Sequence, residues 1–403
     1  MKIGILREGK IPPERRVALL PRQCKEITAT FAEVEFFVQP CSFRCIADEE
    51  YKNAGIALQE DVTHCDILLG IKEVPIQNLI AGKTYFFFSH TIKQQAHNRK
   101  LLQEIIAKNI TLIDYECLVN PVTGERLIAF GRYAGIVGAY NAVWMYGKKH
   151  KLFDLKRAFM CHNYAELQQE YAKIKLPAVK IIITGTGRVG KGVTEVFDGI
   201  GIRKVTPEDF LERNYKEPIY TILSSKDYHY HANGWAWDSQ DFHRNPQDYL
   251  SDFQKFISVA DILITTAFWH PKAPVLFTIQ EAQQADFRIK NVADITCDIE
   301  GSVPVTVQCS TIDEPVYDFN PFSETVETAF SDAQKNISVM AIDNLPCEVP
   351  YDASEYFGRQ FIEFVLPHFF NHDERAILKN ATLTKNGKLT EKFAYLKAFI
   401  KLD

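Results

Sequence analysis

Three glycines in the middle of the chain have the spacing of a loop that binds a phosphate group. Gly185, Gly187 and Gly190 form a G-x-G-x-x-G motif between the apolar run of residues 181–183 and an apolar-periodic segment that suits a helix. In such a strand-to-helix turn, one glycine permits the tight turn, one lets backbone amides approach a pyrophosphate, and one lets helix and strand pack closely. The phosphate lies at the helix N-terminus, where unpaired N–H groups and the helix dipole favour an anion.

The strand before this motif and the helix after it distinguish it from a plain glycine turn, so we predict a dinucleotide-binding loop. The predicted loop comprises Gly185, Thr186, Gly187, Arg188, Val189 and Gly190. An acidic residue about 20 residues after the first glycine would hold the ribose 2′-OH of NAD. We expect the second strand to end near Val205, where the chain reads Arg203-Lys204 and the acids Glu208 and Asp209 come only later. Two bases without a well-placed acid favour NADP(H), and NAD(H) is the alternative if the strand register differs.

Ionisable residues follow four predicted strands in the first part of the chain. KIGIL is followed by Arg7 and by Glu14 to Arg16, DILLGI by Lys72 and Glu73, YFFFS by His90, and TLIDY by Glu116. One charged residue at a strand end is what a turn ordinarily holds. Four strand ends that direct ionisable groups into one crevice are the pattern of a site that binds carboxylates and moves protons.

The elements that would position these groups alternate between strand and helix. Predicted strands include residues 2–6, 34–38, 66–71, 85–89 and 111–115, and predicted helices include residues 21–31 and 94–108. This alternation indicates a parallel sheet with helices on both faces, in which ligands bind beyond the carboxyl ends of the strands.

A second lobe is predicted around the glycine motif. A nearly all-apolar helix at residues 133–148 leads into it, and strands at residues 261–267, 291–295 and 337–342 continue its sheet. A helix at residues 352–367 returns the chain to the first lobe, against which we expect the tail to pack. The predicted fold is therefore α/β, with two Rossmann-like lobes built on parallel sheets. The nucleotide-binding lobe, residues 131–343, is inserted in a discontinuous first lobe of residues 1–130 and 344–403.

Residues 208–258 are polar and aromatic, and they are too long to be a simple linker. We expect an insertion that covers part of the nucleotide pocket. His229, His231 and His243 lie within it, but no fixed i, i+4 pair or cysteine partner accompanies them, so we expect no metal site.

The composition of the 403 residues is that of an ordinary globular protein with two domains. The net charge of -5 argues against nonspecific binding to nucleic acid or to acidic membranes. No apolar run approaches the length of a membrane span, and the N-terminus MKIGILREGK has no signal-peptide pattern. The nine cysteines include no CxxC pair, which indicates free thiols in a reducing compartment, and we expect a cytoplasmic protein. The oligomeric state cannot be read from these patterns.

Several motifs together resemble those of the saccharopine dehydrogenases and, more distantly, alanine dehydrogenase. They are ERRVALLP, GIKEVP, FFFSHTIK, LIDYE, IAFGRYAG, ITGTGRVGKG, CDIEGS and AIDNLPCEVPYDASEYFG. The segment around YTILSSKDYHYH further resembles the lysine–ketoglutarate reductase half of animal aminoadipate semialdehyde synthases, of which we expect a stand-alone version. The resemblance implies that L-lysine, 2-oxoglutarate and a reduced nicotinamide give saccharopine, reversibly.

The resemblance also implies roles for residues that match the family motifs. Lys72 and His90 match an acid–base pair, Arg16 a carboxylate binder, and Arg126 another substrate contact. The remaining matches are acidic: Glu14, Glu73 and Glu116 modulate the site, Asp343 lies near the catalytic lysine, and Asp298 of CDIEGS belongs to the cofactor site. Glu73 departs from the animal reductase, which has a non-acidic residue there.

Two alternatives remain open. One is an NAD-linked saccharopine or alanine dehydrogenase. The other is a non-catalytic nucleotide-binding regulator, which would be expected to have lost the pair of Lys72 and His90, whereas both residues are present.

Overall fold

The computed structural model describes residues 1–401, and the chain divides into two compact units. The first unit combines Met1–Phe130 with the segment that begins at Pro350, and the second unit is the continuous segment Gly131–Val349. The second boundary therefore follows Val349 rather than Asp343. The reason is a short helical turn, Leu345–Glu348, which packs on the first helix of the second unit.

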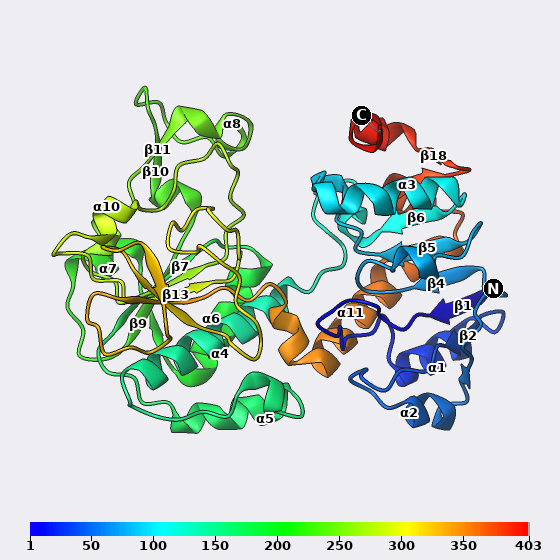
Figure 1. Ribbon diagram of the computed structural model, residues 1–403, viewed down its shortest axis with the longest axis horizontal. Helices are drawn as coiled ribbons and strands as arrows, with labels where there is room; N and C mark the ends of the chain where they lie inside the picture. The colour runs from blue at the N-terminus through cyan, green and yellow to red at the C-terminus, as the bar shows by residue number, and fades with distance from the viewer. Residues whose placement is uncertain (402–403) are drawn as a thin grey trace. The chain divides into compact units, whose positions relative to one another are not determined.

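An eight-stranded sheet forms the centre of the first unit (Figure 1). Its strands are β1 (Lys2–Ile5), β2 (Glu35–Val38), β3 (Ala57–Leu58), β4 (Ile67–Leu69), β5 (Thr84–Phe87), β6 (Thr111–Asp114), β17 (Thr382–Lys385) and β18 (Lys388–Leu389). They lie in the order β18-β17-β6-β5-β4-β1-β2-β3. The strands from β3 to β6 are parallel, and β17 is antiparallel to both of its neighbours, β6 and β18.

The helices of the first unit are α1 (Pro21–Thr30), α2 (Asp48–Asn53), α3 (Arg99–Ala107), α11 (Pro350–Phe364), α12 (Ile377–Ala381) and α13 (Lys397–Ile400). Two of them show why the sequence forms amphipathic helices here. Helix α3 buries Leu101, Leu102 and Ile105, which lie on one helical face, and α11 buries Phe357 and Phe361 four residues apart. The return of the chain through α11 is as predicted.

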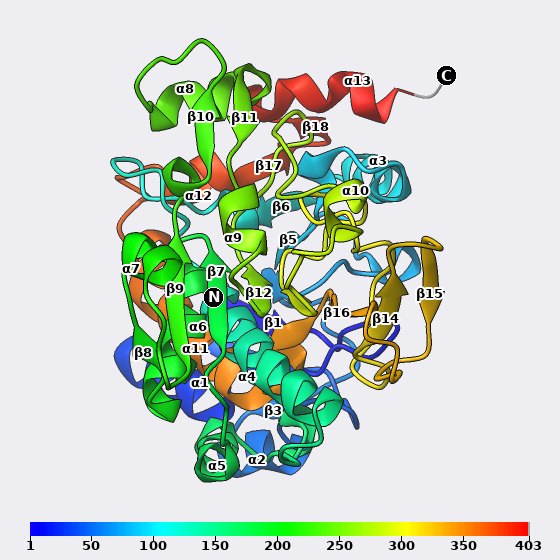
Figure 2. The same cartoon turned by 90° about the vertical axis from the view of Figure 1, so that its left-hand side faces the viewer.

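The second unit contains another eight-stranded sheet, with the order β15-β14-β16-β13-β12-β7-β9-β8 (Figure 2). Its strands are β7 (Lys180–Thr184), β8 (Arg203–Lys204), β9 (Ile219–Leu223), β12 (Ile262–Thr265), β13 (Asn291–Asp294), β14 (Tyr317–Asn320), β15 (Thr325–Glu327) and β16 (Ile337–Met340). Strand β14 is antiparallel to both of its neighbours, β15 and β16, and the other pairs are parallel. Two mostly parallel sheets confirm the predicted fold class.

The helices of the second unit are α4 (Gly131–Lys149), α5 (Tyr164–Gln169), α6 (Arg188–Ile200), α7 (Pro207–Glu212), α8 (Ser239–Arg244), α9 (Gln254–Ile257) and α10 (Ile279–Ala282). Helix α4 is buried on almost every side, in agreement with its apolar sequence. It packs very closely against α6. A Cβ atom at Gly135 would overlap the backbone carbonyl oxygen of Val189, so the close contact depends on glycine at this position. Both helices run side by side along the sheet in Figure 1.

The predicted position of the second strand of this sheet is wrong. Strand β9, not the segment ending near Val205, lies next to β7, and β8 with Arg203 and Lys204 lies at the outer edge. The run IYTIL of β9 is rich in β-branched and aromatic residues, which suits a buried strand, but polar segments on both sides obscured it.

The inserted segment is consequently shorter than residues 208–258. The inserted segment consists mainly of a separate two-stranded hairpin, formed by β10 (His229–His231) and β11 (Tyr249–Ser251). Helix α8 lies in the connection between these strands. In Figure 1 these three elements extend together from one end of the second unit.

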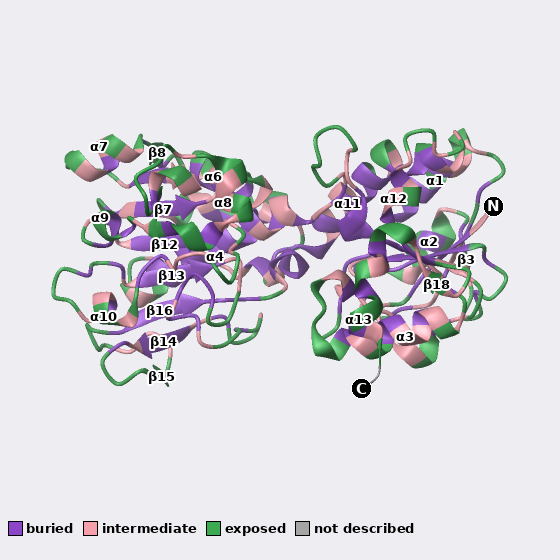
Figure 3. Ribbon diagram, turned by 90° about the horizontal axis from the view of Figure 1, so that it is seen from above, coloured by how far each residue is buried: buried purple, intermediate pink, exposed green. Residues whose placement is uncertain are grey.

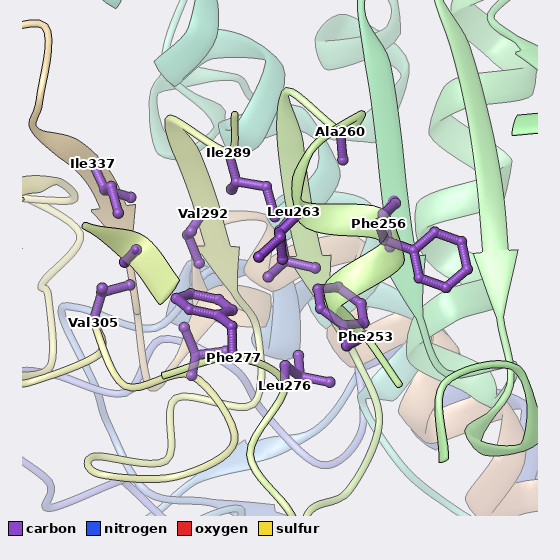
Figure 4. Packing of buried hydrophobic residues seen from close by; sticks show 14 of the residues in the cluster. Phe253, Phe256, Ala260, Leu263, Leu276, Phe277, Ile289, Val292, Val305 and Ile337 are labelled. Atoms are coloured by element: carbon purple, nitrogen blue, oxygen red, sulfur yellow. The ribbon is translucent and has the colours of Figure 1, made fainter. Parts of the chain in front are cut away.

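The central strands of both units are buried and are purple in Figure 3, whereas strands such as β8 and β15 are largely exposed. One core cluster of the second unit packs Phe253, Phe256 and Phe277 against Leu263 and Val292 of the sheet (Figure 4). Along residues 1–401, no helix is both long and apolar enough to cross a bilayer.

Candidate active and cofactor sites

The ionisable residues of the first unit follow strands that are neighbours in the sheet. Strands β6, β5, β4 and β1 are adjacent and parallel, so their carboxyl ends meet at one edge. Arg7 and Glu8 follow β1, Lys72 and Glu73 follow β4, His90 follows β5, and Glu116 follows β6. The edge therefore carries acids, bases and an imidazole on four consecutive strands.

His90 and Glu73 form a hydrogen-bonded pair at this edge. The Nδ1 atom of His90 bonds to a carboxylate oxygen of Glu73, and the two side chains are 19% and 25% exposed. Although burial opposes ionisation, the hydrogen bond and charge of His90 hold the pKa of Glu73 below its usual value. Lys72 adds a smaller effect in the same direction. The pair therefore favours an ionised carboxylate beside an imidazole, which is an arrangement that can hold and release a proton.

The backbone that carries His90 is held in an uncommon conformation. His90 has a φ of 52°, in the left-handed region that non-glycine residues rarely adopt. Asp114, which is fully buried at the end of β6, accepts hydrogen bonds from the backbone N–H and the hydroxyl of Ser89. Burial raises the pKa of Asp114 to about 6. The neighbouring strand thus fixes the residue before His90.

Glu8 connects two parts of the edge, and the sequence patterns did not single it out. Its carboxylate oxygens accept hydrogen bonds from the backbone N–H groups of Ile71 at 2.6 Å and Lys72 at 2.9 Å. Burial and the nearby charge of Glu14 raise the pKa of Glu8 to about 8. The signal in the sequence is its position two residues beyond the strand KIGIL, at the same edge as Lys72.

Arg16 and Glu14 form a buried ion pair. The Nε and Nη2 atoms of Arg16 donate to the two carboxylate oxygens of Glu14 at 2.8 and 2.7 Å, and the side chains are 3% and 0% exposed. The guanidinium also lies 4.1 Å from the centre of the Phe130 ring. Glu14 therefore occupies one fork of the guanidinium that was predicted to bind a substrate carboxylate.

Arg126 is the more accessible of the two predicted arginines. Its Nη2 donates to Glu116 at 3.0 Å, and its side chain is 48% exposed whereas that of Glu116 is 6% exposed. Asp343 and Asp298, in contrast, belong to the second unit, where they follow β16 and β13 respectively.

The glycine motif has the predicted strand-loop-helix setting. Strand β7 ends at Thr184, Gly185 has a φ of 101°, and Gly187 is the N-cap of α6. A Cβ atom at Gly190 would overlap the Gly185 carbonyl oxygen, so only glycine permits this packing. A Cβ atom at Gly187 would meet nothing within 4 Å, which leaves open space where a phosphate would approach the helix N-terminus.

A pocket of about 480 Å³ opens beside this loop, within the second unit. Its walls come from the loops after β7, β9 and β12 and from the insertion. They include Gly185, Thr186, Gly187, Ser224, Ser225, Lys226, His229, Trp237, Phe242, His243, Thr266, Phe268 and Trp269. Arg203 and Lys204 are absent from this lining. The free space at Gly187 and the glycine cradle fit the phosphates of a dinucleotide, and the aromatic walls fit its adenine.

No group of three or more His, Cys, Asp or Glu side chains within residues 1–401 could hold a metal ion. All nine cysteines are free thiols.

The chain has two α/β units with mostly parallel sheets, one of them with a glycine-rich strand-to-helix turn, and this fold is similar to that of alanine dehydrogenase. A solved structure of an L-alanine dehydrogenase aligns over 99% of both chains with a TM-score of 0.64 and 16% identity. Residues 4–137 match the family model of the alanine dehydrogenase/PNT N-terminal domain.

Two relatives that are similar in sequence identify the group of proteins more closely than the fold does. The mitochondrial α-aminoadipic semialdehyde synthase of Rattus norvegicus is 30% identical over 98% of the chain, which spans about half, 47%, of that protein. The saccharopine dehydrogenase [NAD(+), L-lysine-forming] of Yarrowia lipolytica is 26% identical over 91% of the chain and 92% of its own length. The chain is thus a homologue of the saccharopine dehydrogenases and the α-aminoadipic semialdehyde synthases. The resemblance predicted from the motifs is confirmed.

Proposed function

We propose that the chain catalyses the reversible, NADPH-dependent reductive condensation of L-lysine with 2-oxoglutarate to saccharopine. The observation that carries this proposal is the His90–Glu73 pair, placed beside Lys72 on neighbouring strand ends. The similarity to the α-aminoadipic semialdehyde synthase of Rattus norvegicus, which extends over 98% of the chain, supports the proposal.

The proposed chemistry requires several proton transfers. A neutral amine attacks the ketone, a carbinolamine forms, and water leaves to give an imine, and each step needs a group that titrates near the working pH. In this proposal Lys72 and His90 exchange these protons, and Glu73 stabilises the charged imidazole. When bound, the reduced nicotinamide supplies the hydride that the imine carbon receives.

Recognition of the diacid substrate is assigned to the arginines, because a guanidinium binds a carboxylate with two parallel hydrogen bonds. Arg126 is half exposed and offers the more accessible fork, whereas Arg16 is buried against Glu14. We therefore assign the first carboxylate contact to Arg126. Arg16 and Glu14 lie near Glu8 at the same edge of the sheet, and we assign them a contribution to substrate binding.

An NAD-linked saccharopine dehydrogenase is the second candidate. The Yarrowia lipolytica relative carries NAD(+) in its name, and the match extends over 92% of that enzyme. The two candidates differ in cofactor and share the residues of the first unit.

The test is the oxidation of NADPH and of NADH, followed by loss of near-ultraviolet absorbance, with panels of amines and 2-oxoacids. Fastest turnover with L-lysine and 2-oxoglutarate is expected. Turnover with ammonia and pyruvate instead would replace this proposal with alanine dehydrogenase activity. Lys72→Met and His90→Gln should each lower kcat by about 10²- to 10⁴-fold, and unchanged kcat in both variants would refute the assignment.

A further inference from the structure

We propose that Cys297 and Cys309 form a reversible redox pair, which a peroxide converts into a disulfide within the chain. Cys297 follows the end of β13, and Cys309 directly precedes Ser310, which pairs with Ile342 beyond the end of β16. Both cysteines belong to the second unit. The modification requires neither a substrate nor the proposed reaction, so the two proposals can fail separately.

The two sulfur atoms are in contact in the folded chain. The Sγ atoms of Cys297 and Cys309 lie 3.4 Å apart, whereas a disulfide bond is about 2.0 Å long. The sulfur atoms therefore have to approach each other by about 1.4 Å to form a bond. Because Cys309 is exposed, its side chain is free to turn toward Cys297.

Cys309 is the thiol that an oxidant in solution reaches first. It is the one exposed cysteine of the nine, all of which lie within residues 1–401. It also lines an open pocket of about 440 Å³ together with Tyr317 and Phe330, and this pocket has ample room for hydrogen peroxide. Cys45 and Cys297 are half-buried, and the other six thiols are buried. An oxidant in solution therefore encounters Cys309 before any other sulfur.

Cys297 is held in position to react second. Its backbone has a φ of 54°, and its N–H donates to the buried carboxylate of Asp294 at 3.2 Å. Its Sγ lies 3.0 Å from the backbone oxygen of Ala341. Burial and, after it, the hydrogen bond to Cys309 raise the pKa of Cys297, so this sulfur is a thiol near neutral pH. A thiol is the group with which a sulfenic acid condenses.

The disulfide forms in two steps. The Cys309 thiolate attacks one oxygen of hydrogen peroxide, the O–O bond breaks, and the departing hydroxide takes up the proton that the thiol released, which leaves a sulfenic acid and water. The Cys297 sulfur then attacks the sulfenic sulfur, the S–O bond breaks, and the departing hydroxide takes the Cys297 proton to form a second water. Two thiols are thereby oxidised by two electrons while one peroxide is reduced. A dithiol reverses the change by thiol–disulfide exchange.

The disulfide closes a loop that contributes to the wall of the nucleotide pocket. Ser302 lies between the two cysteines in the sequence and lines the pocket beside the glycine motif. Val303 and Val305 of the same loop are fully buried in the core of the second unit. A covalent cross-link removes conformations from the opened state of a loop, so the loop opens less often. Oxidation should therefore slow amide hydrogen exchange across residues 298–308.

The test is peptide mapping of the intact chain after brief treatment with hydrogen peroxide and alkylation of the remaining thiols. Trypsin releases residues 291–335 as one peptide, which contains Cys297 and Cys309 and no other cysteine. This peptide should lose two hydrogen atoms and take up no alkylating agent, and dithiothreitol should restore both thiols. Cleavage after Glu300 should give fragments that remain joined until the disulfide is reduced.

Single variants distinguish the roles of the two thiols. Cys309→Ser should leave Cys297 reduced after the same treatment. Cys297→Ser leaves the sulfenic acid of Cys309 without a partner, so Cys309 should proceed to sulfinic acid about tenfold faster than in the intact chain. Cys45→Ser removes a half-buried thiol of the first unit and is the matched control, in which the disulfide should form as in the intact chain.

Two results would overturn the redox pair. One is alkylation of both Cys297 and Cys309 in the intact chain at a peroxide dose that oxidises Cys309 in Cys297→Ser. The other is formation of sulfinic acid at Cys309 at the same rate in the intact chain and in Cys297→Ser. Slower amide exchange across residues 298–308 after oxidation, absent in Cys309→Ser, would support the cross-link in the folded protein.

Discussion

Replacement of Glu73 by glutamine removes one charge from the His90–Glu73 pair and keeps the size of the side chain. In the intact protein burial opposes ionisation of Glu73, but the hydrogen bond and the charge of His90 hold the pKa of this carboxylate below its usual value. The carboxylate is therefore ionised across the neutral pH range, whereas the amide of glutamine carries no charge. Glu73→Gln should consequently lower kcat/KM at every pH of that range.

The size of the loss follows from the geometry of the pair. A hydrogen bond that involves a charged group contributes about 1.5–3 kcal/mol, and about 1.4 kcal/mol corresponds to a tenfold change in rate. This range gives a decrease of about 10- to 100-fold in kcat/KM. Because the side chains are 19% and 25% exposed, solvent screening favours the lower end, about tenfold.

The assay is kcat/KM for the condensation of L-lysine with 2-oxoglutarate, measured from about pH 5.5 to 9.5 at fixed ionic strength. Glu60→Gln is the matched control, because it removes a carboxylate from the exposed Arg7–Glu60 pair of the same unit. Its profile should coincide with that of the intact chain. A Glu73→Gln profile that also coincides would refute the view that the ionised Glu73 carboxylate supports His90 in the reaction.

Three further predictions concern stability and cofactor binding. Arg16→Met alone should lower the free energy of unfolding by about 3–5 kcal/mol in urea titrations, because it leaves the buried Glu14 carboxylate unpaired, and adding Glu14→Gln should recover part of the loss. Gly190→Ala should lower both Tm and NADPH affinity, whereas Gly187→Ala should keep Tm and weaken only NADPH binding, as measured by thermal unfolding and fluorescence titration. Asp114 has a folded pKa of about 6, above its ordinary value near 4, so its contribution to stability is complete below about pH 4 and is lost as pH rises through 6. Urea titrations of Asp114→Asn should lack this decline, about 3 kcal/mol, and an identical pH dependence would contradict the assignment.

The sequence predicted those features that depend on local patterns. The apolar runs of β1, β4, β5 and β6 were recognised because β-branched and aromatic residues are concentrated in them. The glycine loop was recognised because its three glycines serve three separate steric requirements.

Features that depend on pairing between distant segments were not predictable in the same way. Arg203-Lys204 forms a genuine strand, but only the register against β9 shows that it lies at the edge and at the wrong level for the nucleotide. Glu8 gains its position from backbone N–H groups of Ile71 and Lys72, more than sixty residues later in the chain. The edge strand β15 is short and mostly exposed, so it has no strong apolar pattern, and its neighbour β14 is buried but also short and partly polar.

The order of strands in the first unit has a consequence for synthesis on the ribosome. Strand β6 pairs on its outer side with β17, so Ile113 meets Thr382 only after the whole second unit has been translated. The second unit, a continuous segment, can complete its sheet first, although it comes later in the chain than β1 to β6. During that interval the N-terminal strands have an open edge at β6, and such edges attract other strands. The nascent chain is therefore most exposed to mispairing, and most in need of a chaperone, between the emergence of β6 and that of β17.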